Sequence, residues 1–237
     1  MDPKTTMQTP EEHRLEEELR RCDPDKVGHD KEVSVERIAR MAKEIEDGFH
    51  LLSKYRLGAT FFGSARCGVG EEYYEAARLL AGRLSRAGFS IVTGGASGIM
   101  EAANRGAFEA GGQSVGLNIK LPHEQGSNEY LTEEKTFNYF FSRKVMLTFA
   151  SEVYLYFPGG FGTFDELFEI LTLIQTKKIK RVPIILYGRK FWEPVIAMLR
   201  SQMAEEFNTI SASDLELFTL VDSVDEAYDA VLAQVKC

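Results

Sequence analysis

The stretch PGGFGTFDE, residues 158–166, decides how this chain folds. It follows a compact apolar run, Val153 to Phe157, and leads into apolar positions at helical spacing, which predicts a strand, a glycine-rich turn and the start of a helix. Glycines let the backbone approach a ligand closely, and the free N–H groups and positive dipole end of a helix start favour a phosphate. We expect Asp165 and Glu166 in the first helical turn, where extra negative charge would not help to bind phosphate. The stretch therefore predicts an anion site with a further chemical task.

The preceding chain repeats this arrangement of strand, glycine-bearing loop and helix. The pattern predicts strands at Ala59–Phe62, Ser90–Thr93 and Ser114–Ile119, and helices at Tyr73–Ala87 and from Ile99 to about Ala110. Strands that alternate with helices predict an α/β fold: a Rossmann-like, doubly wound parallel sheet with helices on both faces. The loops at Gly63, Gly94 and Gly159 then share the carboxyl edge of the sheet, where such folds bind ligands.

The rest of the chain predicts one domain, residues 32–237, behind a charged and mobile tail, residues 1–31. After Ser34, a predicted N-cap, a helix to about Tyr55 carries one apolar face that should pack on the core or on a second subunit: Val35, Ile38, Met41, Ala42, Ile45, Phe49 and Leu52. Further predicted elements are a strand at Thr136–Tyr139, a helix opening near Phe140, a strand at Val182–Leu186, a helix at Phe191–Met203, a strand at Thr219–Val221 and a helix at Val224–Val235.

Composition limits the classes of function. With 237 residues, 44% of them hydrophobic, the chain can bury a large single core. A net charge of −8 argues against a nucleic-acid surface, and the absence of a long apolar run predicts no membrane span, so we expect a soluble cytoplasmic protein. The cysteines and histidines have neither disulfide nor metal-ligand spacing. We expect no metal site.

The fixed positions of the string at 158–166 resemble the PGGxGTxxE signature of the Lonely Guy (LOG) family, phosphoribohydrolases that act on cytokinin nucleotides and related nucleoside monophosphates. The resemblance extends from about Ser34 to Val235. It implies hydrolysis of the N-glycosidic bond of a cytokinin riboside 5′-monophosphate or AMP to a free base and ribose 5-phosphate. It also implies a homodimer or higher homo-oligomer with a shared pocket. Such proteins are sometimes labelled lysine decarboxylases, but no lysine here stands in a recognisable pyridoxal-phosphate constellation.

The resemblance also implies site residues. Arg143 and Glu166 match the catalytic pair, although Phe140-Phe141-Ser142 replaces the family's Met-His-x lead, and Met100-Glu101 stands where many plant members have Met-Gly. The implied substrate-binding residues are Ser64, Gly94, Gly95, Glu124, Lys144, Gly159, Gly160, Gly162, Thr163, Asp165 and Thr172. The Arg143–Lys144 pair opens a helix, where cations are unfavourable, and such local conflict often marks function.

These residues permit a mechanism and leave alternatives. A carboxylate near the anomeric carbon can stabilise a ribosyl cation, and Glu166 is the candidate for it. Arg143 would clamp ribose or phosphate oxygens, or keep Glu166 ionised. The group that protonates the leaving base is not identified, and the chemistry needs no metal or redox cofactor. The alternative function is a non-catalytic nucleotide or molybdenum-cofactor carrier. A dehydrogenase would need a GxGxxG turn, which the sequence lacks.

Overall fold

The computed structural model describes residues 34–121 and 126–235, together with Arg14 and Glu17. The chain divides into two compact units, Met1–Arg40 and Met41–Cys237. In the first unit, helix α3 (Val35–Leu52) begins as expected, because the Ser34 hydroxyl accepts a hydrogen bond from the Arg37 N–H at 3.2 Å. The predicted tail, residues 1–31, lies outside the described residues except at two positions, so its mobility stays a prediction.

In the described part of the second unit, the strands form one sheet in the order β4-β3-β2-β1-β5-β6-β7, and every neighbouring pair is parallel. The strands are β1 (Gly58–Phe62), β2 (Ser90–Thr93), β3 (Ser114–Ile119), β4 (Glu133–Phe137), β5 (Val153–Tyr156), β6 (Ile184–Tyr187) and β7 (Thr219–Val221). The helices after α3 are α4 (Glu72–Arg86), α5 (Ile99–Glu109), α6 (Phe140–Thr148), α7 (Phe161–Gln175), α8 (Arg189–Met198) and α9 (Val224–Gln234). The predicted Rossmann-like α/β class is confirmed.

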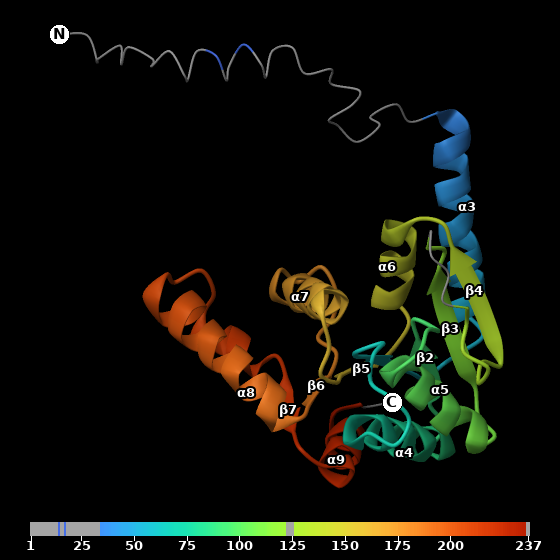
Figure 1. Cartoon of the computed structure of the whole chain (residues 1–237). Helices are drawn as coiled ribbons and strands as arrows, with labels where there is room; N and C mark the ends of the chain where they lie inside the picture. The colour runs from blue at the N-terminus through green and yellow to red at the C-terminus, as the bar shows by residue number, and fades with distance from the viewer. Residues whose placement is uncertain (1–13, 15–16, 18–33, 122–125, 236–237) are drawn as a thin grey trace. The chain divides into compact units, whose positions relative to one another are not determined.

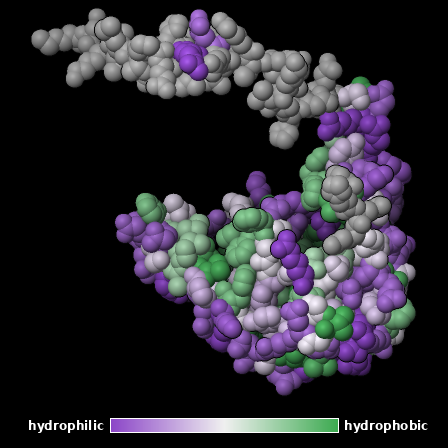
Figure 2. Space-filling view, viewed as in Figure 1, coloured by the Kyte–Doolittle hydropathy of each residue, from purple (hydrophilic) through white to green (hydrophobic). Residues whose placement is uncertain are grey.

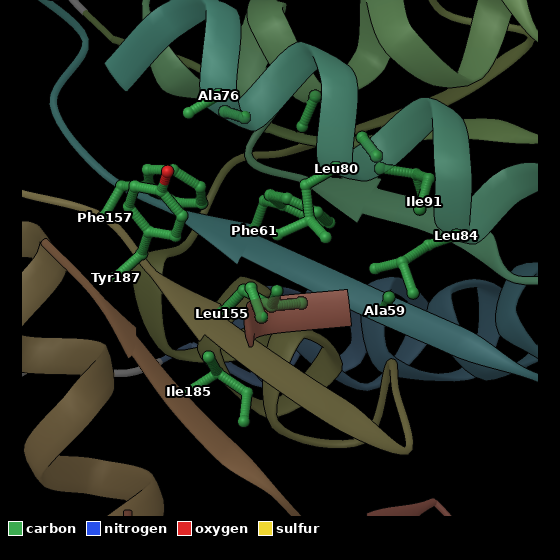
Figure 3. Packing of buried hydrophobic residues seen from close by; sticks show 14 of the residues in the cluster. Ala59, Phe61, Ala76, Leu80, Leu84, Ile91, Leu155, Phe157, Ile185 and Tyr187 are labelled. Carbon is green, nitrogen blue, oxygen red and sulfur yellow. The ribbon is translucent and has the colours of Figure 1, made fainter. Parts of the chain in front are cut away.

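Two apolar cores lie on the two faces of this sheet. Alternate residues of β5 serve them: Leu155 belongs to the core under α4, α5 and α9, whereas Tyr154 and Tyr156 belong to the core under α6, α7 and α8. Figure 1 shows these two groups of helices on opposite sides of the strands. In the first core, the rings of Phe157 and Tyr187 stack with centroids 4.5 Å apart (Figure 3). Each central strand is therefore buried on both faces, as its continuous apolar sequence requires.

The strand order reverses direction between β1 and β5. The chain builds β2, β3 and β4 to one side of β1 and then returns to place β5 on the other side. The loops after these two strands meet at the crevice, where the Ser64 N–H donates to the carbonyl of Pro158 at 3.0 Å. A Cβ on Gly159 would lie 3.1 Å from the carbonyl carbon of Gly63, so this close approach favours glycine. The crevice is a topological switch point, the usual ligand site of open α/β sheets.

The buried face of α3 coincides with the predicted apolar face only at Leu52, which is buried, and in part at Ile45, which packs against the core. Its buried residues are Glu44, Gly48, Leu51 and Leu52, while Phe49 is 45% exposed. The physical reason is close packing: a Cβ on Gly48 would lie 2.3 Å from the sulfur of Met146, so α3 approaches α6 along its smallest residue. Of the two expectations for the apolar face, packing on the core is wrong for Phe49, and packing on a second subunit stays a prediction.

Smaller differences concern the ends of elements. The predicted strand at Thr136–Tyr139 is β4, which begins earlier at Glu133, and the predicted helix after β6 is α8, which continues as a π-helical stretch, Leu199–Glu206. In the described ranges, no helix combines the length and the apolar character needed to cross a bilayer.

Candidate active site

A cavity of about 820 Å³ opens at the switch point, which is within the usual size of a small-molecule site. It is bounded by the loops after β1, β2 and β5 and by residues of α5, α6, α7 and α8. Its lining residues are Phe62, Gly63, Ser64, Ala65, Arg66, Gly94, Met100, Phe140, Arg143, Leu147, Gly159, Gly160, Phe161, Gly162, Thr163, Phe164, Asp165, Glu166 and Phe191. The three glycine-bearing loops that the sequence placed at one edge therefore share one cavity.

The glycine turn leads directly into α7. Gly160 is the N-cap residue, and its carbonyl accepts from the Thr163 N–H at 3.0 Å. A Cβ on Gly159 would lie 2.1 Å from the Thr163 hydroxyl oxygen, so the turn can fold against Thr163 only without a side chain there. Because the first N–H groups of a helix have no partners within the helix, this end of the cavity is suited to an anion.

The two carboxylates stand further along α7 than the sequence predicted. The helix begins at Phe161, its first turn contains no acidic residue, and Asp165 and Glu166 lie in the second turn. The prediction failed because the turn residues Phe161 and Gly162 are already helical. The first turn of α7 therefore carries no negative side chain, and the two carboxylates lie one turn further along the helix.

Glu166 has the perturbed chemistry expected of a functional carboxylate. Its side chain is buried, with 7% of its surface exposed. Burial raises its pKa to about 7, and the nearby cations Lys144 and Arg143 hold the pKa down against that burial. A carboxyl group with a pKa near neutrality can gain and lose a proton at working pH, which is frequent in active sites.

Arg143 enters the cavity from α6. Its Nε–H donates to the carbonyl of Leu117, at the end of β3, at 2.6 Å. Burial lowers the pKa of its guanidinium, and the negative charge of Glu166 opposes this effect. A Cβ on Gly94 would lie 2.3 Å from Arg143 Nη2, so the glycine after β2 provides room for this side chain. Arg143 and Glu166 come from different helices, and both line the cavity.

Lys144 lies next to the cavity without lining it. Its ammonium group forms ion pairs with Asp165 at 2.8 Å and with Glu169 at 3.0 Å, and so joins α6 to α7. Arg143 thus lines the cavity itself, whereas Lys144 pairs with two carboxylates of α7, of which Asp165 lines the cavity.

The remaining predicted site residues divide in the same way. Ser64, Gly94, Gly159, Gly160, Gly162, Thr163 and Asp165 line the cavity. Gly95, which follows the lining residue Gly94, is outside the lining, and its N–H donates to the Thr93 hydroxyl at 2.8 Å. Thr172 is exposed on α7 and is also outside the lining. Glu124 lies outside the described residues. That any of these residues binds substrate stays a prediction.

The sequence missed the apolar wall of the cavity. Phe62, Met100, Phe140, Leu147, Phe164 and Phe191 all contribute to it. Their helical and strand spacing is that of ordinary core residues, so no sequence signal separated them from the core. At the Met100-Glu101 departure, Met100 lines the cavity, whereas Glu101 is outside the lining and accepts a hydrogen bond from the Tyr74 hydroxyl at 2.8 Å.

The arrangement combines a glycine turn at a helix start, a buried carboxyl group, a partly buried guanidinium and an apolar wall. Such a site can hold a ligand with a phosphate at one end and a flat apolar group at the other. Within the described ranges, no group of three His, Cys, Asp or Glu residues is placed to bind a metal ion.

Fold and cavity together define a Rossmann-like α/β protein with a cavity at its switch point. The family model described as "Possible lysine decarboxylase" matches residues 100–231, more than half of the chain. The chain belongs to this family, the LOG family that the signature at 158–166 predicted.

Curated relatives carry the names expected for that family. A probable cytokinin riboside 5′-monophosphate phosphoribohydrolase of rice, Oryza sativa subsp. japonica, is 31% identical over 159 residues, 65% of this chain and 63% of the rice protein. The chain thus spans less than two thirds of that relative. The cytokinin riboside 5′-monophosphate phosphoribohydrolase of Rhodococcoides fascians is 26% identical over 63% of this chain and 77% of its own.

Among solved structures, a molybdenum cofactor carrier protein from Chlamydomonas reinhardtii has a TM-score of 0.57 and 23% identity, with 75% of this chain and 97% of that chain covered. At this identity, the likeness shows the fold alone.

Proposed function

We propose that this protein hydrolyses the N-glycosidic bond of a cytokinin riboside 5′-monophosphate, of AMP, or of both, and releases the free base and ribose 5-phosphate. The observation that carries the proposal is the buried Glu166, with its pKa near 7, in one cavity with Arg143 and the glycine turn. A carboxylate beside the anomeric carbon stabilises the ribosyl cation that forms when the base departs. The names of the relatives support the substrate class.

In this proposal the 5′-phosphate binds at the turn from Gly159 to Thr163, at the start of α7. Binding energy from this non-reacting group then positions the sugar over Glu166. The base packs on the apolar wall, where Phe62 and Phe164 offer aromatic surface. Contacts of Glu124, Gly95 and Thr172 with the substrate rest on the family resemblance alone.

Of the two roles open to Arg143, the electrostatic one has a specific observation in its favour. Its positive charge holds the pKa of Glu166 down against the effect of burial. Without this charge, the carboxyl group would stay protonated to a higher pH and would stabilise the ribosyl cation less at neutral pH. Contact of the guanidinium with ribose or phosphate oxygens is compatible with the same position.

A homodimer or higher homo-oligomer belongs to the same proposal. The rings of Phe49 on α3 and Phe149 after α6 lie 5.8 Å apart, and both are about half exposed. At the cavity, Phe161 is 97% exposed, and Figure 2 shows further hydrophobic residues over α7 and α8. A second copy of this chain would remove such surface from water. The cytoplasmic location expected from the sequence is likewise part of the proposal.

The second candidate is a carrier of a nucleotide or of the molybdenum cofactor without turnover, which the fold of the Chlamydomonas protein favours. A carrier needs the anion-binding turn but gives no reason for a buried carboxyl group beside a partly buried guanidinium. Turnover decides between the two functions.

The purified protein would be incubated with AMP and with isopentenyladenosine monophosphate, and released base and ribose 5-phosphate would be separated chromatographically. We expect the wild-type protein to release both products, and we expect Glu166→Gln and Arg143→Ala to abolish this release. Glu193→Gln changes an exposed residue on α8 and should leave the release intact. Binding of both nucleotides without cleavage would refute the hydrolase and favour the carrier.

A further inference from the structure

The start of α6 carries the catalytic candidate Arg143 and lacks a cap of its own. Tyr139, the N-cap residue, makes no capping hydrogen bond with its side chain. Arg143 and Lys144 stand within the first five residues of the helix, where a cation meets the positive end of the helix dipole. A helix start with these features needs a negative charge from elsewhere in the chain.

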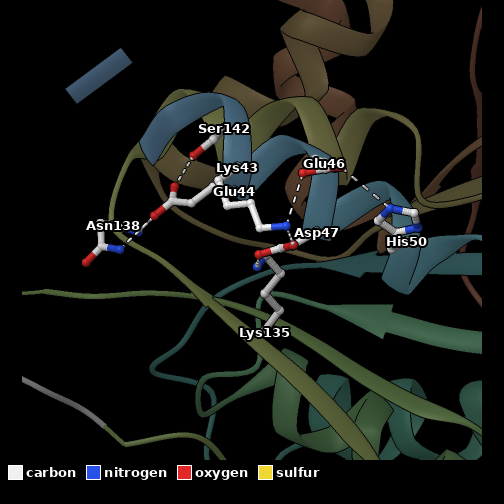
Figure 4. Close-up of polar contacts among 8 residues, drawn as sticks. All are labelled: Lys43, Glu44, Glu46, Asp47, His50, Lys135, Asn138 and Ser142. Carbon is white, nitrogen blue, oxygen red and sulfur yellow. Dashed lines mark hydrogen bonds and ion pairs between the residues drawn. The ribbon is translucent and has the colours of Figure 1, made fainter. Parts of the chain in front are cut away.

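Glu44, on α3, supplies this charge (Figure 4). One carboxylate oxygen, Oε1, accepts from the backbone N–H of Asn138 at 2.8 Å and from its side-chain amide at 2.7 Å. The other oxygen, Oε2, lies 2.6 Å from the Ser142 hydroxyl. These partners precede and begin α6, so the carboxylate, which lies more than ninety residues away in the sequence, ties the start of that helix to α3.

The Glu44 carboxylate is charged. Glu44 is 8% exposed, and burial acts to raise its pKa, but the hydrogen bonds from Ser142 and Asn138 outweigh this effect and hold the pKa below its usual value. Sequence patterning gave no sign of this role, because Glu44 is a charged residue that lies between the apolar positions of α3. A buried, ionised carboxylate with satisfied hydrogen bonds fixes geometry more strictly than a surface charge does.

The surrounding contacts transmit this constraint to Arg143. One turn after Glu44, Gly48 packs against Met146 of α6 with no room for a Cβ, so the two helices are in direct contact on the same face of α3. At the other end of its side chain, Arg143 Nε–H donates to Leu117. The guanidinium is thus held between β3 and the start of α6, whose position depends on Glu44.

We infer that Glu44 is a positioning residue of the active site: its buried carboxylate fixes the first turn of α6 and thereby aims Arg143 into the cavity. Glu44 itself is outside the lining of the cavity and acts through another residue. The effect on catalysis rests on the proposed function, whereas the effect on the Arg143 side chain does not.

The first test measures solvent exchange of the Arg143 Nε–H by NMR, assigned with Arg143→Lys. Glu44→Gln keeps the shape and removes the charge, and Glu46→Gln makes the same change at an exposed position of the same helix. We expect Glu44→Gln to accelerate exchange about fivefold, as loss of a buried hydrogen bond would, and Glu46→Gln to leave it unchanged. Equal exchange in all three proteins would overturn the inference.

Ser142→Ala keeps the test decisive if Glu44→Gln does not fold. It removes one donor to the carboxylate and retains the charge, so we expect a smaller acceleration of the same Arg143 exchange. If Ser142→Ala folds and the exchange rate is unchanged, the contact between Ser142 and Glu44 does not position Arg143, and the inference is wrong.

The second test uses AMP. In a wild-type background, we expect Glu44→Gln to lower kcat/KM about tenfold or more, since small displacements of a catalytic group are costly, and to weaken AMP binding. In an Arg143→Ala background, the same substitution should not weaken AMP binding further, because Glu44 acts through Arg143. A merely structural role would weaken binding in both backgrounds. If the wild-type protein binds AMP and does not cleave it, the proposed function fails while the exchange and binding results still decide the role of Glu44.

Discussion

Replacing Glu166 with glutamine is expected to stabilise the folded protein at pH 8 and to have little such effect at pH 4. The folded protein holds the Glu166 pKa at about 7 instead of 4.5, chiefly because the group is buried. Between these values the folded state binds more protons than the unfolded state, so stability is greatest below pH 4.5 and falls as the pH rises to 7. A tenfold change in an ionisation constant corresponds to about 1.4 kcal/mol, so the whole cost is about 3 kcal/mol. Glutamine does not ionise and avoids this cost.

Urea unfolding followed by circular dichroism, at a series of pH values from 4 to 8, measures the effect directly. The stability of the glutamine variant minus that of wild type should grow by about 3 kcal/mol across the series, which corresponds to about 6–12 °C in Tm for a domain of this size. Glu193→Gln, at an exposed position on α8, serves as the control, and its difference from wild type should not change with pH. A pH-independent difference for Glu166→Gln would show that burial does not disfavour its charge, and the account of this site would fail.

The same carboxyl group links stability to activity. Stabilising a ribosyl cation requires the ionised form, so kcat/KM of the wild-type protein should rise with pH and level off above about 7. Activity therefore rises over the range in which stability falls, as expected when a buried charge is kept for function at a cost to folding.

Three further substitutions test other parts of the site. Gly94→Ala places a Cβ 2.3 Å from the guanidinium of Arg143. We expect a normal Tm and a loss of kcat/KM of tenfold or more. Full activity would contradict the assigned position of the guanidinium. Gly159→Ala places a Cβ 2.1 Å from the Thr163 hydroxyl oxygen and close to the neighbouring loop backbone. Calorimetry should show a weaker affinity for inorganic phosphate and a Tm lower by several degrees. Unchanged phosphate binding would argue against the turn as the anion site. Phe49→Glu places a charge on the exposed apolar surface; light scattering should show a smaller oligomer than wild type, and an unchanged mass would exclude this surface as the interface.

The fold and much of the cavity could be predicted because local sequence encodes them. Runs such as Val153 to Phe157 are apolar throughout, since a central parallel strand is buried on both faces. The turns that follow such strands contain glycines at positions where close contacts leave no room for a side chain. Gly94 and Gly159 are glycine for reasons of contact that the structure now specifies: one provides room for Arg143 and the other for Thr163.

The features that could not be predicted depend on partners distant in the sequence. Helical spacing marks the apolar residues of α3 but not the face that packs, which Gly48 decides through its contact with α6. Similarly, Glu44 was indistinguishable from a solvent-facing residue, although it is buried against a helix start more than ninety residues away. The apparent conflict of two cations, Arg143 and Lys144, at that helix start is resolved by charges on other elements. Glu44 of α3 accepts a hydrogen bond from Ser142, and Asp165 of α7 pairs with Lys144.

The position of Glu166 in the second turn of α7 has a chemical reason. A phosphate near the carboxylate would raise its pKa further, because like charges disfavour the ionised form, and would suppress the species that the proposed reaction needs. Glu166 follows the N-cap Gly160 by six residues, so the rise of 1.5 Å per residue separates the helix start from the carboxylate-bearing turn by about 9 Å along the axis. The start of α7 can then bind the phosphate while the sugar occupies the space between. In that arrangement Lys144 and Arg143 are the positive charges that hold the pKa of Glu166 down, and the charge balance of the site depends on how α6 positions these two residues.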